Sequence, residues 1–225
     1  MSAEFSVAEV HEAIAATRPD AVCLVFRDRR LTWQQVTERT RRLANHLLGA
    51  GLGCRTERSE LQGHESGQSH LAIYLHNGNE YLECMLGSFK ARVAPFNVNY
   101  RYVAEELRYL LNDSNASAIV VHSQFAPTLA EVLPTLPNLR VILQVPDSSG
   151  NALLPGAVWY EDALAAASAD VVRLLFFSRR NGTELSQRHL RRQGRLSKLH
   201  NLEPKDIQQL ARNNMLLSLD VAAPS

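Results

Sequence analysis

Three histidines spaced six residues apart are the first residues in this chain that could do chemistry. They are His64, His70 and His76. Imidazole nitrogen binds zinc, but a zinc site needs a fixed geometry and acidic or thiol companions. Two of the three histidines fall in a polar stretch of the sequence. We therefore interpret them as solvated side chains, and the sequence predicts no metal-binding residue.

Two pairs of adjacent acids are candidates for general acid–base catalysis. They are Glu105-Glu106 and Glu161-Asp162, and both fall in segments with helical patterning. Neighbouring residues of a helix point in different directions, so neither pair can converge on one substrate atom. The sequence predicts solvated helix faces at both places.

Ser114, Ser117 and Ser123 lie near His122 in the sequence, which raises the possibility of a serine hydrolase. None of them has the G-x-S-x-G surroundings of a nucleophile elbow. The hydrolase interpretation is therefore weak, and the sequence predicts no catalytic residue and no cofactor-binding residue.

The overall composition is that of an ordinary globular protein. The chain has 225 residues, of which 45% are hydrophobic and 21% charged, with a net charge of +1. This length suits one domain, or one domain with an appendage. The average conceals an asymmetry, because residues 171–200 carry eight Arg or Lys against Glu184 alone. An acidic body is therefore followed by a basic segment, which indicates two compositions in one chain.

Cysteine usage and the N-terminal sequence favour the cytoplasm. Cys23, Cys54 and Cys84 are odd in number and have no CxxC spacing, which is typical of reduced thiols. We see no basic segment followed by an apolar one near the start, so we expect no signal peptide. The longest apolar runs are too short for a membrane span.

Hydrophobic periodicity predicts that helices and strands alternate along the acidic body. After a first helix at 5–17, residues 21–32 have the pattern of a hairpin around Asp28. Thr32 and Gln35 form a capping-box pattern at the start of the next helix. Pro95 places its strand at an edge or a bulge of the sheet. The later strands are expected at 71–75, 93–98, 119–121 and 140–145, and the helices at 32–48, 79–89, 103–111, 127–133 and 159–167.

The helical patterns also predict which faces are buried. In the first helix we expect Val7, Val10, Ile14 and Ala15 to form the inward stripe. In the helix that follows Thr32, the apolar positions define the inward face, and Gly49 and Gly51 suit a left-handed C-cap. The solvent side of that helix is expected to carry Arg39, Arg41, Arg42 and Asn45.

Four strand–helix alternations with short connections predict an α/β fold. Such alternation is typical of βαβ units, in which a mainly parallel sheet has helices on its faces. The polar stretch at 55–69 interrupts this alternation and is expected to be a long loop without secondary structure.

The order of short sequence blocks resembles the start of an adenylate-forming (AMP-binding) enzyme, and most closely an acyl-CoA synthetase, that is, a fatty-acid–CoA ligase. The resemblance covers about residues 6–168 and depends on order and spacing. The blocks are Leu31-Thr32-Trp33, Arg41-Arg42-Leu43-Ala44, Leu71-Ala72-Ile73-Tyr74-Leu75, Tyr81-Leu82-Glu83-Cys84-Met85-Leu86-Gly87, Phe96-Asn97-Val98-Asn99-Tyr100-Arg101-Tyr102 and Glu105-Glu106-Leu107-Arg108-Tyr109-Leu110-Leu111.

The resemblance implies the first subdomain of such a ligase. It also implies the family's reaction, in which ATP and a carboxylate form an acyl-adenylate that CoA converts to a thioester. The family uses ATP, Mg and CoA, but we expect no cofactor to bind this chain. We therefore predict a ligase fragment that is inactive alone.

Two departures from the family pattern support that prediction. Residues 55–69 have the character of an insertion, and the Thr/Ser/Gly-rich loop ending in Pro-Lys-Gly is absent. In the family, this loop holds the ATP phosphates with clustered backbone amides. The nearest candidate is Asn181-Gly182-Thr183-Glu184, which lacks the lysine and carries an acid.

Residues 169–225 do not resemble the family and are expected to be a divergent basic tail, partly helical or disordered. Residues 171–177 suit a strand, and a helix could start near Pro204. A frameshift or gene truncation could explain this segment. Alternatively, it is a selected element that binds a partner or nucleic acid.

Three hypotheses of function follow. The first is the inactive ligase fragment, with domain limits 1–168 and 169–225. The second is a non-catalytic module that forms a homo- or hetero-oligomer through an apolar face. The third is a nucleic-acid binder that uses the basic tail. The third is the least favoured, because the tail lacks a pattern of aromatic residues for base stacking.

Overall fold

The computed structural model describes residues 6–172. The expected strand at 171–177, the Asn181-Gly182-Thr183-Glu184 segment and the helix near Pro204 lie wholly or mostly outside the described residues. The described elements follow in the order α1 (Val7–Thr17), β1 (Val22–Phe26), β2 (Arg29–Thr32), α2 (Trp33–Gly49), η1 (Arg58–Glu60), β3 (His70–Tyr74), α3 (Asn79–Ala91), β4 (Ala94–Asn97), α4 (Ala104–Asp113), β5 (Ala116–His122), η2 (Ser123–Phe125), α5 (Ala126–Val132), η3 (Leu133–Thr135), β6 (Val141–Val145), β7 (Val158–Trp159) and α6 (Tyr160–Ala166).

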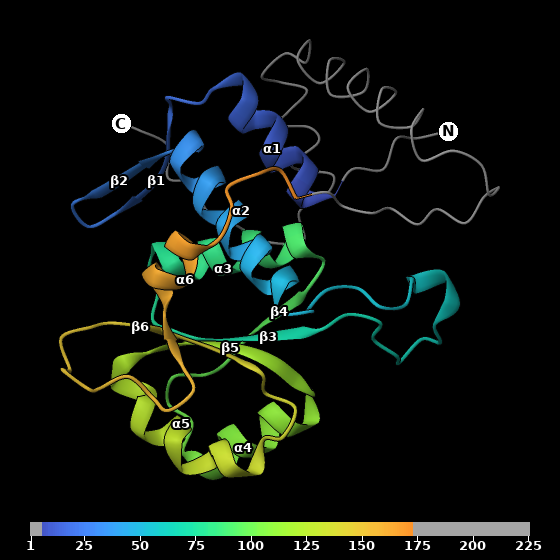
Figure 1. Ribbon diagram of the computed structural model, residues 1–225, viewed down its shortest axis with the longest axis vertical. Helices are drawn as coiled ribbons and strands as arrows, with labels where there is room; N and C mark the ends of the chain where they lie inside the picture. The colour runs from blue at the N-terminus through green and yellow to red at the C-terminus, as the bar shows by residue number, and fades with distance from the viewer. Residues whose placement is uncertain (1–5, 173–225) are drawn as a thin grey trace, which may run out of the picture. The chain divides into compact units, whose positions relative to one another are not determined.

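A parallel five-stranded sheet forms the centre, with strand order β4-β3-β5-β6-β7. Figure 1 shows α2, α3 and α6 on one side of this sheet and α4 and α5 on the other. One apolar core lies under each helix layer, because strands of a sheet covered on both faces bury side chains on both sides. The predicted α/β fold is confirmed.

Of the two edge strands of the sheet, one was predicted from the sequence and the other was not. Strand β4 is an edge strand and contains Pro95, as predicted. The other edge, β7, was missed, because only two residues pair with β6. Trp159 belongs to this short strand, and the helix predicted at 159–167 begins one residue later.

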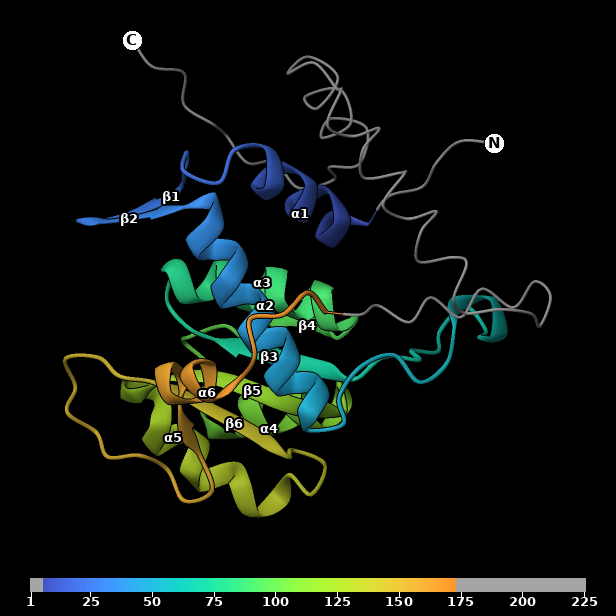
Figure 2. The same ribbon diagram turned by 45° about the horizontal axis from the view of Figure 1, so that its top comes forward.

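The hairpin and the helix that follows it form as predicted. Strands β1 and β2 pair antiparallel, and Figure 2 shows this hairpin beyond the N-terminal end of α2, away from the main sheet. Thr32 and Gln35 form the capping box of α2. At the other end, Gly51 has φ +73°, and the N–H of Leu52 donates to Leu47 O at 3.0 Å, which closes a Schellman motif.

Helices α2 and α3 approach each other closely because α3 carries a glycine at the contact. A Cβ atom on Gly87 would lie 2.8 Å from Leu43 Cδ2. Leu43 is fully buried and cannot move aside. Gly87, which lies in one of the sequence blocks that resemble the ligase family, therefore sets the distance between these two helices.

The polar stretch at 55–69 is more ordered than predicted. It contains the short helix η1, and an isolated antiparallel bridge joins Cys54 to Gln68. Arg92 forms a bidentate ion pair with Glu57, with N–O distances of 2.8 and 2.7 Å. The missed order comes from pairing between the two arms of the loop, which a local sequence pattern does not reveal.

The predicted inward stripe of α1 is wrong at Val7 and right at Ala15. Val7 is 52% exposed, whereas Ala8, His11 and Ala15 are buried. His11 lies against the ring of Trp33, with 5.4 Å between ring centroids. The inward face of α1 therefore combines two alanines with His11, next to Glu12 and its charged partners.

Those partners form a buried charged cluster. Glu12 accepts hydrogen bonds from Arg41, and its Oε1 lies 2.5 Å from Nζ of the buried Lys90. Burial lowers the pKa of Lys90, and Glu12 opposes that shift. Neither ring nitrogen of His11 has a hydrogen-bond partner among the described residues. Burial, together with the Lys90 charge, lowers the His11 pKa to about 4.

The expected solvent side of α2 is also wrong. Arg39, Arg41 and Arg42 are mostly buried, with side-chain exposures of 17%, 27% and 29%. Arg42 Nη1 donates to Ala167 O at 2.7 Å, and Asn45 Nδ2 donates to Ser168 O at 2.8 Å. These polar side chains contact α1, α3 and the segment after α6, which the periodicity of α2 alone could not show.

The buried neutral His11 predicts a loss of stability in mild acid. The unfolded chain protonates this histidine near pH 6.5, whereas the folded chain resists protonation down to about pH 4. Stability is therefore complete above pH 6.5 and falls as the pH drops from 6.5 to 4, by about 1–3 kcal/mol from this group. Urea unfolding at several pH values should show a smaller loss in His11→Gln. His64→Gln, at an exposed loop position, is the control, and an equal loss in all three proteins would refute the assignment.

Candidate functional site

The order of strands defines one place where a ligand site is expected. From β3 the chain moves to β4 on one side and then to β5 on the other side of β3. In open parallel sheets, ligands bind beyond the carboxyl ends of the strands at such a switch point. Here the switch point lies beyond Tyr74 of β3 and His122 of β5.

Four rings gather at this switch point, which we call the switch-point cluster: His76, Tyr100, His122 and Phe125. The centroid of His76 lies 4.9 Å from that of Tyr100, 5.1 Å from Phe125 and 5.9 Å from His122. Tyr100 is 45% exposed. The buried ring of Tyr74 stacks on Phe125 at 4.5 Å and supports the cluster from below.

Hydrogen bonds fix the orientation of both imidazoles. The backbone N–H of His76 donates to His122 Nδ1 at 3.0 Å, and the Gln124 side-chain amide contacts His76 Nε2. His122 Nδ1 is therefore an acceptor, which leaves its proton on Nε2. Burial lowers the pKa of His122, so the imidazole is held neutral.

Asp147, after β6, closes the polar side of the cluster. Its carboxylate accepts the backbone N–H of Gln124 and of Ser149, each at 2.8 Å. Burial opposes its ionisation, but these hydrogen bonds outweigh it and lower the pKa of Asp147. Both carboxylate oxygens of Asp147 accept backbone N–H groups of the neighbouring loops, so Asp147 has a structural role and is not a free catalytic base.

The chemistry open to this cluster is recognition of a planar group. An exposed aromatic ring beside two oriented imidazoles can stack on a planar ligand and exchange hydrogen bonds with it. Arg101 lies over the Tyr100 ring at 5.5 Å and adds positive charge. Among residues 6–172, no group of three or more His, Cys, Asp or Glu side chains is placed to hold a metal ion.

The three histidines considered from the sequence do not converge. His64 is exposed in the loop, His70 begins β3, and His76 follows the other end of that strand. His64 and His76 are exposed, as predicted, whereas His70 is partly buried and its Nδ1 contacts Ser114 O. No local sequence pattern indicates the switch-point cluster, since its four rings come from separate segments.

The acids and serines considered from the sequence also have other roles. Glu106 accepts the backbone N–H of Val103 at the start of α4, and Glu105 is exposed. Ser123 is buried and its Oγ accepts from Gln144 Nε2 at 3.0 Å, which is a structural bond. Glu161 is half exposed, and it also forms an ion pair with Arg39.

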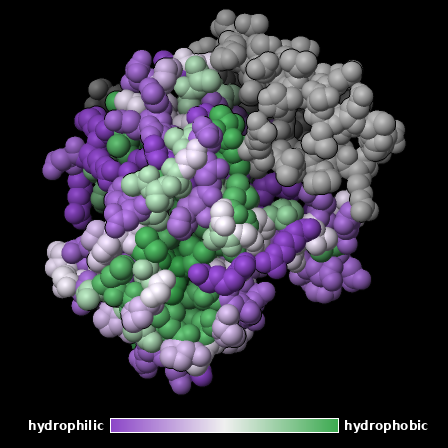
Figure 3. Space-filling model, in the orientation of Figure 1, coloured by the Kyte–Doolittle hydropathy of each residue, from purple (hydrophilic) through white to green (hydrophobic). Residues whose placement is uncertain are grey.

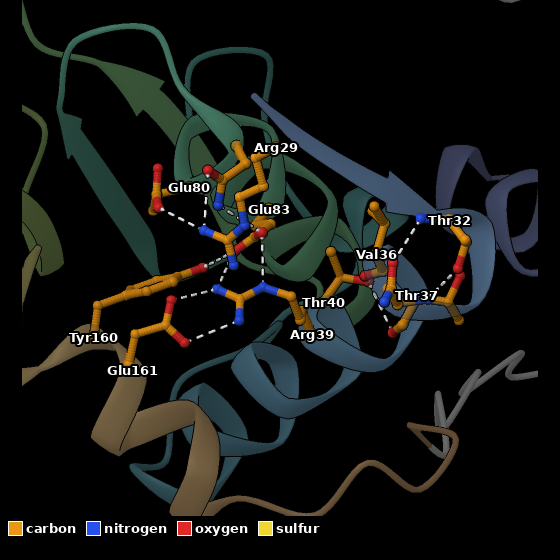
Figure 4. Close-up of polar contacts among 12 residues, drawn as sticks. Arg29, Thr32, Val36, Thr37, Arg39, Thr40, Glu80, Glu83, Tyr160 and Glu161 are labelled. Carbon is orange, nitrogen blue, oxygen red and sulfur yellow. Dashed lines mark hydrogen bonds and ion pairs between the residues drawn. The ribbon is translucent and has the colours of Figure 1, made fainter. Parts of the chain in front are cut away.

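That ion pair belongs to a polar network shown in Figure 4. Glu83 of α3 is fully buried and accepts hydrogen bonds from Arg39 at 2.8 and 3.0 Å. The Asn79 amide and the Tyr160 hydroxyl each donate to it at 3.0 Å. Arg39 also reaches both carboxylate oxygens of Glu161.

Every strong acceptor position of Glu83 is therefore occupied, and the network joins α2, α3 and α6. Burial opposes the charge on Arg39, but hydrogen bonds to Glu161 and Glu83 outweigh it and raise its pKa. Burial raises the pKa of Tyr160 well above its ordinary range, so it stays a neutral donor. The arrangement is structural, since no group in it is left free to react.

The chain is similar to known proteins over most of its length. Residues 11–178 match the protein family described as AMP-binding enzyme. The chain belongs to this family. This AMP-binding family member is 58% identical over 165 residues to the medium-chain acyl-CoA ligase Mig of Mycobacterium avium. It is 35% identical over 171 residues to a medium/long-chain-fatty-acid–CoA/3-oxocholest-4-en-26-oate–CoA ligase of Mycobacterium marinum.

The matches cover most of this AMP-binding family member but a minor part of its relatives. The match to the M. avium ligase covers 73% of this chain and 30% of that ligase. The match to the M. marinum ligase covers 76% of this chain and 29% of that ligase. The chain therefore spans about a third of the length of these curated relatives. Both relatives are acyl-CoA ligases, which supports the predicted fatty-acid–CoA ligase family.

Solved structures confirm the fold of this AMP-binding family member. The anthranilate CoA ligase AuaEII, solved with anthranoyl-AMP, aligns with a TM-score of 0.62 at 19% identity, over 76% of this chain and 30% of that chain. Acetoacetyl-CoA synthetase from Streptomyces lividans aligns with a TM-score of 0.61 at 20% identity, over 75% and 26% of the two chains.

The network around Glu83 predicts a large difference between two acidic positions. Glu83→Gln leaves the mostly buried Arg39 without its fully buried partner and should lower the free energy of unfolding by about 3 kcal/mol. Glu161→Gln removes an acid that is half exposed, so the loss should stay below about 1 kcal/mol. Urea titration measures both values. Equal losses would show that burial does not set the strength of these contacts.

Proposed function

We propose that residues 6–172 are the first subdomain of an ATP-dependent, AMP-forming fatty-acid–CoA ligase and act as its scaffold. The family match over residues 11–178 is the main support. The parallel sheet, with helices packed on both faces, has the architecture that such a scaffold requires. The switch-point cluster would then form one wall of a substrate site that other parts of the ligase complete.

The family's reaction has two steps that this proposal assigns to the complete ligase. A carboxylate attacks the α-phosphate of ATP, which gives an acyl-adenylate and pyrophosphate. The thiol of CoA then attacks the acyl carbon, and AMP leaves as the thioester forms. Medium-chain fatty acids are the proposed substrates, because the relative at 58% identity is called a medium-chain acyl-CoA ligase.

The residues of this chain do not fit ATP and Mg well enough to hold them alone. The sequence contains no Thr/Ser/Gly-rich loop ending in Pro-Lys-Gly. The described residues offer no cluster suited to a metal ion. We therefore propose that the 225-residue chain binds neither cofactor by itself.

The proposal predicts that the purified chain does not activate fatty acids. With octanoate, ATP and Mg, we expect no octanoyl-AMP by mass spectrometry and no pyrophosphate release above a protein-free blank. The missing phosphate-binding loop is the physical reason. The M. avium ligase in the same assay is the positive control. Formation of octanoyl-AMP by the chain would overturn the proposal of inactivity while leaving the family intact.

Location in the cytoplasm is part of the proposal. The described structure holds Cys23, Cys54 and Cys84 as free thiols, which suits a reducing compartment. Within the part of the chain that the structure describes, no helix has the length and apolar character needed to cross a bilayer.

A second candidate is an interaction module that pairs with another copy of the chain. Strand β7 covers only Leu143 and Gln144 of β6, and near this edge Leu153 and Val158 are 36% and 43% exposed. Figure 3 shows apolar surface gathered over the lower half of the view, where α5, α6 and residues 146–157 lie in Figure 1. Contiguous apolar surface of this kind marks interaction sites.

This candidate predicts self-association that depends on the β7 edge. Light scattering after gel filtration should show a dimer that Val158→Glu weakens, because a charge there would have to be desolvated in the interface. Val103→Glu is the matched control, since Val103 is 62% exposed next to α4. A strictly monomeric chain that binds no hydrophobic dye would contradict the module. A nucleic-acid role for the basic tail stays a separate hypothesis, because that segment lies outside the described residues.

A further inference from the structure

Ser66 and His70 form a hydrogen-bonded pair at the amino end of β3. The switch-point cluster lies at the opposite, carboxyl end of the same strand. Ser66 Oγ lies 2.7 Å from His70 Nε2. The other ring nitrogen of His70, Nδ1, contacts the backbone carbonyl oxygen of Ser114. The Ser66 hydroxyl, the His70 imidazole and the Ser114 carbonyl are therefore linked by two consecutive contacts.

The carbonyl of Ser114 determines which nitrogen of His70 carries the proton. A carbonyl oxygen can only accept, so Nδ1 must donate and Nε2 must present its lone pair. That lone pair faces the Ser66 hydroxyl. A base held by a third group in this tautomer is the arrangement that activates a serine nucleophile.

The base and the group that orients it both lie on rigid elements. His70 is the first residue of β3 and pairs with Ala94 of β4 and Ala116 of β5. Ser114 is the C-cap of α4, directly before the left-handed residue Asn115, with φ +50°. Neither group can move far without disturbing the centre of the sheet.

Ser66 lies in the 55–69 loop, but its position there is fixed. Gly67 O accepts the backbone N–H groups of Arg55 and Thr56, at 2.7 and 3.2 Å. A Cβ atom on Gly67 would lie 2.1 Å from Thr56 O, so only glycine permits this approach. The two arms of the loop are therefore locked together one residue after Ser66.

The surroundings of Ser66 suit attack on an activated acyl group. Ser66 is exposed, so a substrate can reach it from solvent. The backbone N–H of Gln68 donates to Ser66 Oγ at 3.4 Å and helps to hold the hydroxyl oxygen in place. The Gln68 side chain is held by Arg92 O at 2.8 Å and stays out of the way.

We propose that Ser66 is a nucleophile, activated by His70, that takes acyl groups from activated esters and thioesters. Ser66 Oγ forms a bond to the carbonyl carbon, and its proton passes to His70 Nε2. The tetrahedral intermediate then expels the alcohol or thiol, which leaves with the proton from His70. Water, deprotonated by His70, hydrolyses the acyl-serine to a carboxylic acid and regenerates the pair.

This activity does not depend on the ligase reaction and needs no ATP. It would make the chain an acyl-ester or thioester hydrolase of low specificity, because Ser66 is exposed at the surface of the described structure. The pair has no G-x-S-x-G pattern in the sequence, since Ser66 lies in a loop and His70 at a strand end.

The test uses the full 225-residue chain with p-nitrophenyl acetate and a fluorophosphonate probe. The serine oxygen displaces fluoride from phosphorus, so the probe marks an activated serine without any acyl specificity. Peptide mapping should place the label on Ser66, and Ser66→Ala should abolish it. His70→Gln should slow both labelling and p-nitrophenol release by about 100-fold, the scale of general base catalysis.

Matched variants separate an activated serine from a structural hydrogen bond. His64→Gln changes a histidine of the same loop that contacts no serine in the described structure, and its labelling rate should equal that of the parent chain. Gly67→Ala should shift Ser66 and lower labelling while the melting temperature of the chain shows that it remains folded. An unlabelled Ser66 in the folded parent chain, or equal labelling of parent and His70→Gln, would overturn the proposal.

Discussion

The carboxylate of Glu83, fully buried in the middle of α3, is the constraint on which the helix layer depends. An isolated charge in that position would be very unfavourable, so its partners must arrive together with it. Arg39 comes from α2, Tyr160 from α6 and Asn79 from the first turn of α3. Three helices far apart in the sequence are therefore fixed to one another by one residue. Gly87, one turn further along α3, lets α2 approach closely enough for the arginine to reach.

Strand β3 connects this helix layer to both places where chemistry is possible. It is central in the sheet, with β4 on one side and β5 on the other. Its carboxyl end leads to the switch-point cluster around His76, and its amino end carries His70 beside Ser66. The two histidines are six residues apart in sequence but lie at opposite ends of β3, because an extended strand advances by about 3 Å with each residue.

The parts of the fold that could be predicted from sequence are those that depend on local patterns. The α2 capping box, the Pro95 edge strand and the strand–helix alternation each arise from neighbouring residues. The parts that were missed depend on pairing at a distance. Strand β7 exists only because β6 accepts two of its residues, and α1 turns His11 inward only because Lys90 and Arg41 receive Glu12. The position of Arg39 in the helical repeat predicts a solvent-facing side chain. Its pairing with Glu83 and Glu161 is visible only in the tertiary structure.

By itself, the sequence determined the family, the α/β class and the absence of a Pro-Lys-Gly phosphate loop, because these are properties of residue order. Only the tertiary structure decided which polar residues act together. Ser66, His70 and Ser114 are brought into line by a loop, a strand and a helix end, and the rings of the switch-point cluster converge from separate connections. Hydrogen bonds act over about 3 Å, and no spacing along the chain can report a distance that the packing of the sheet sets.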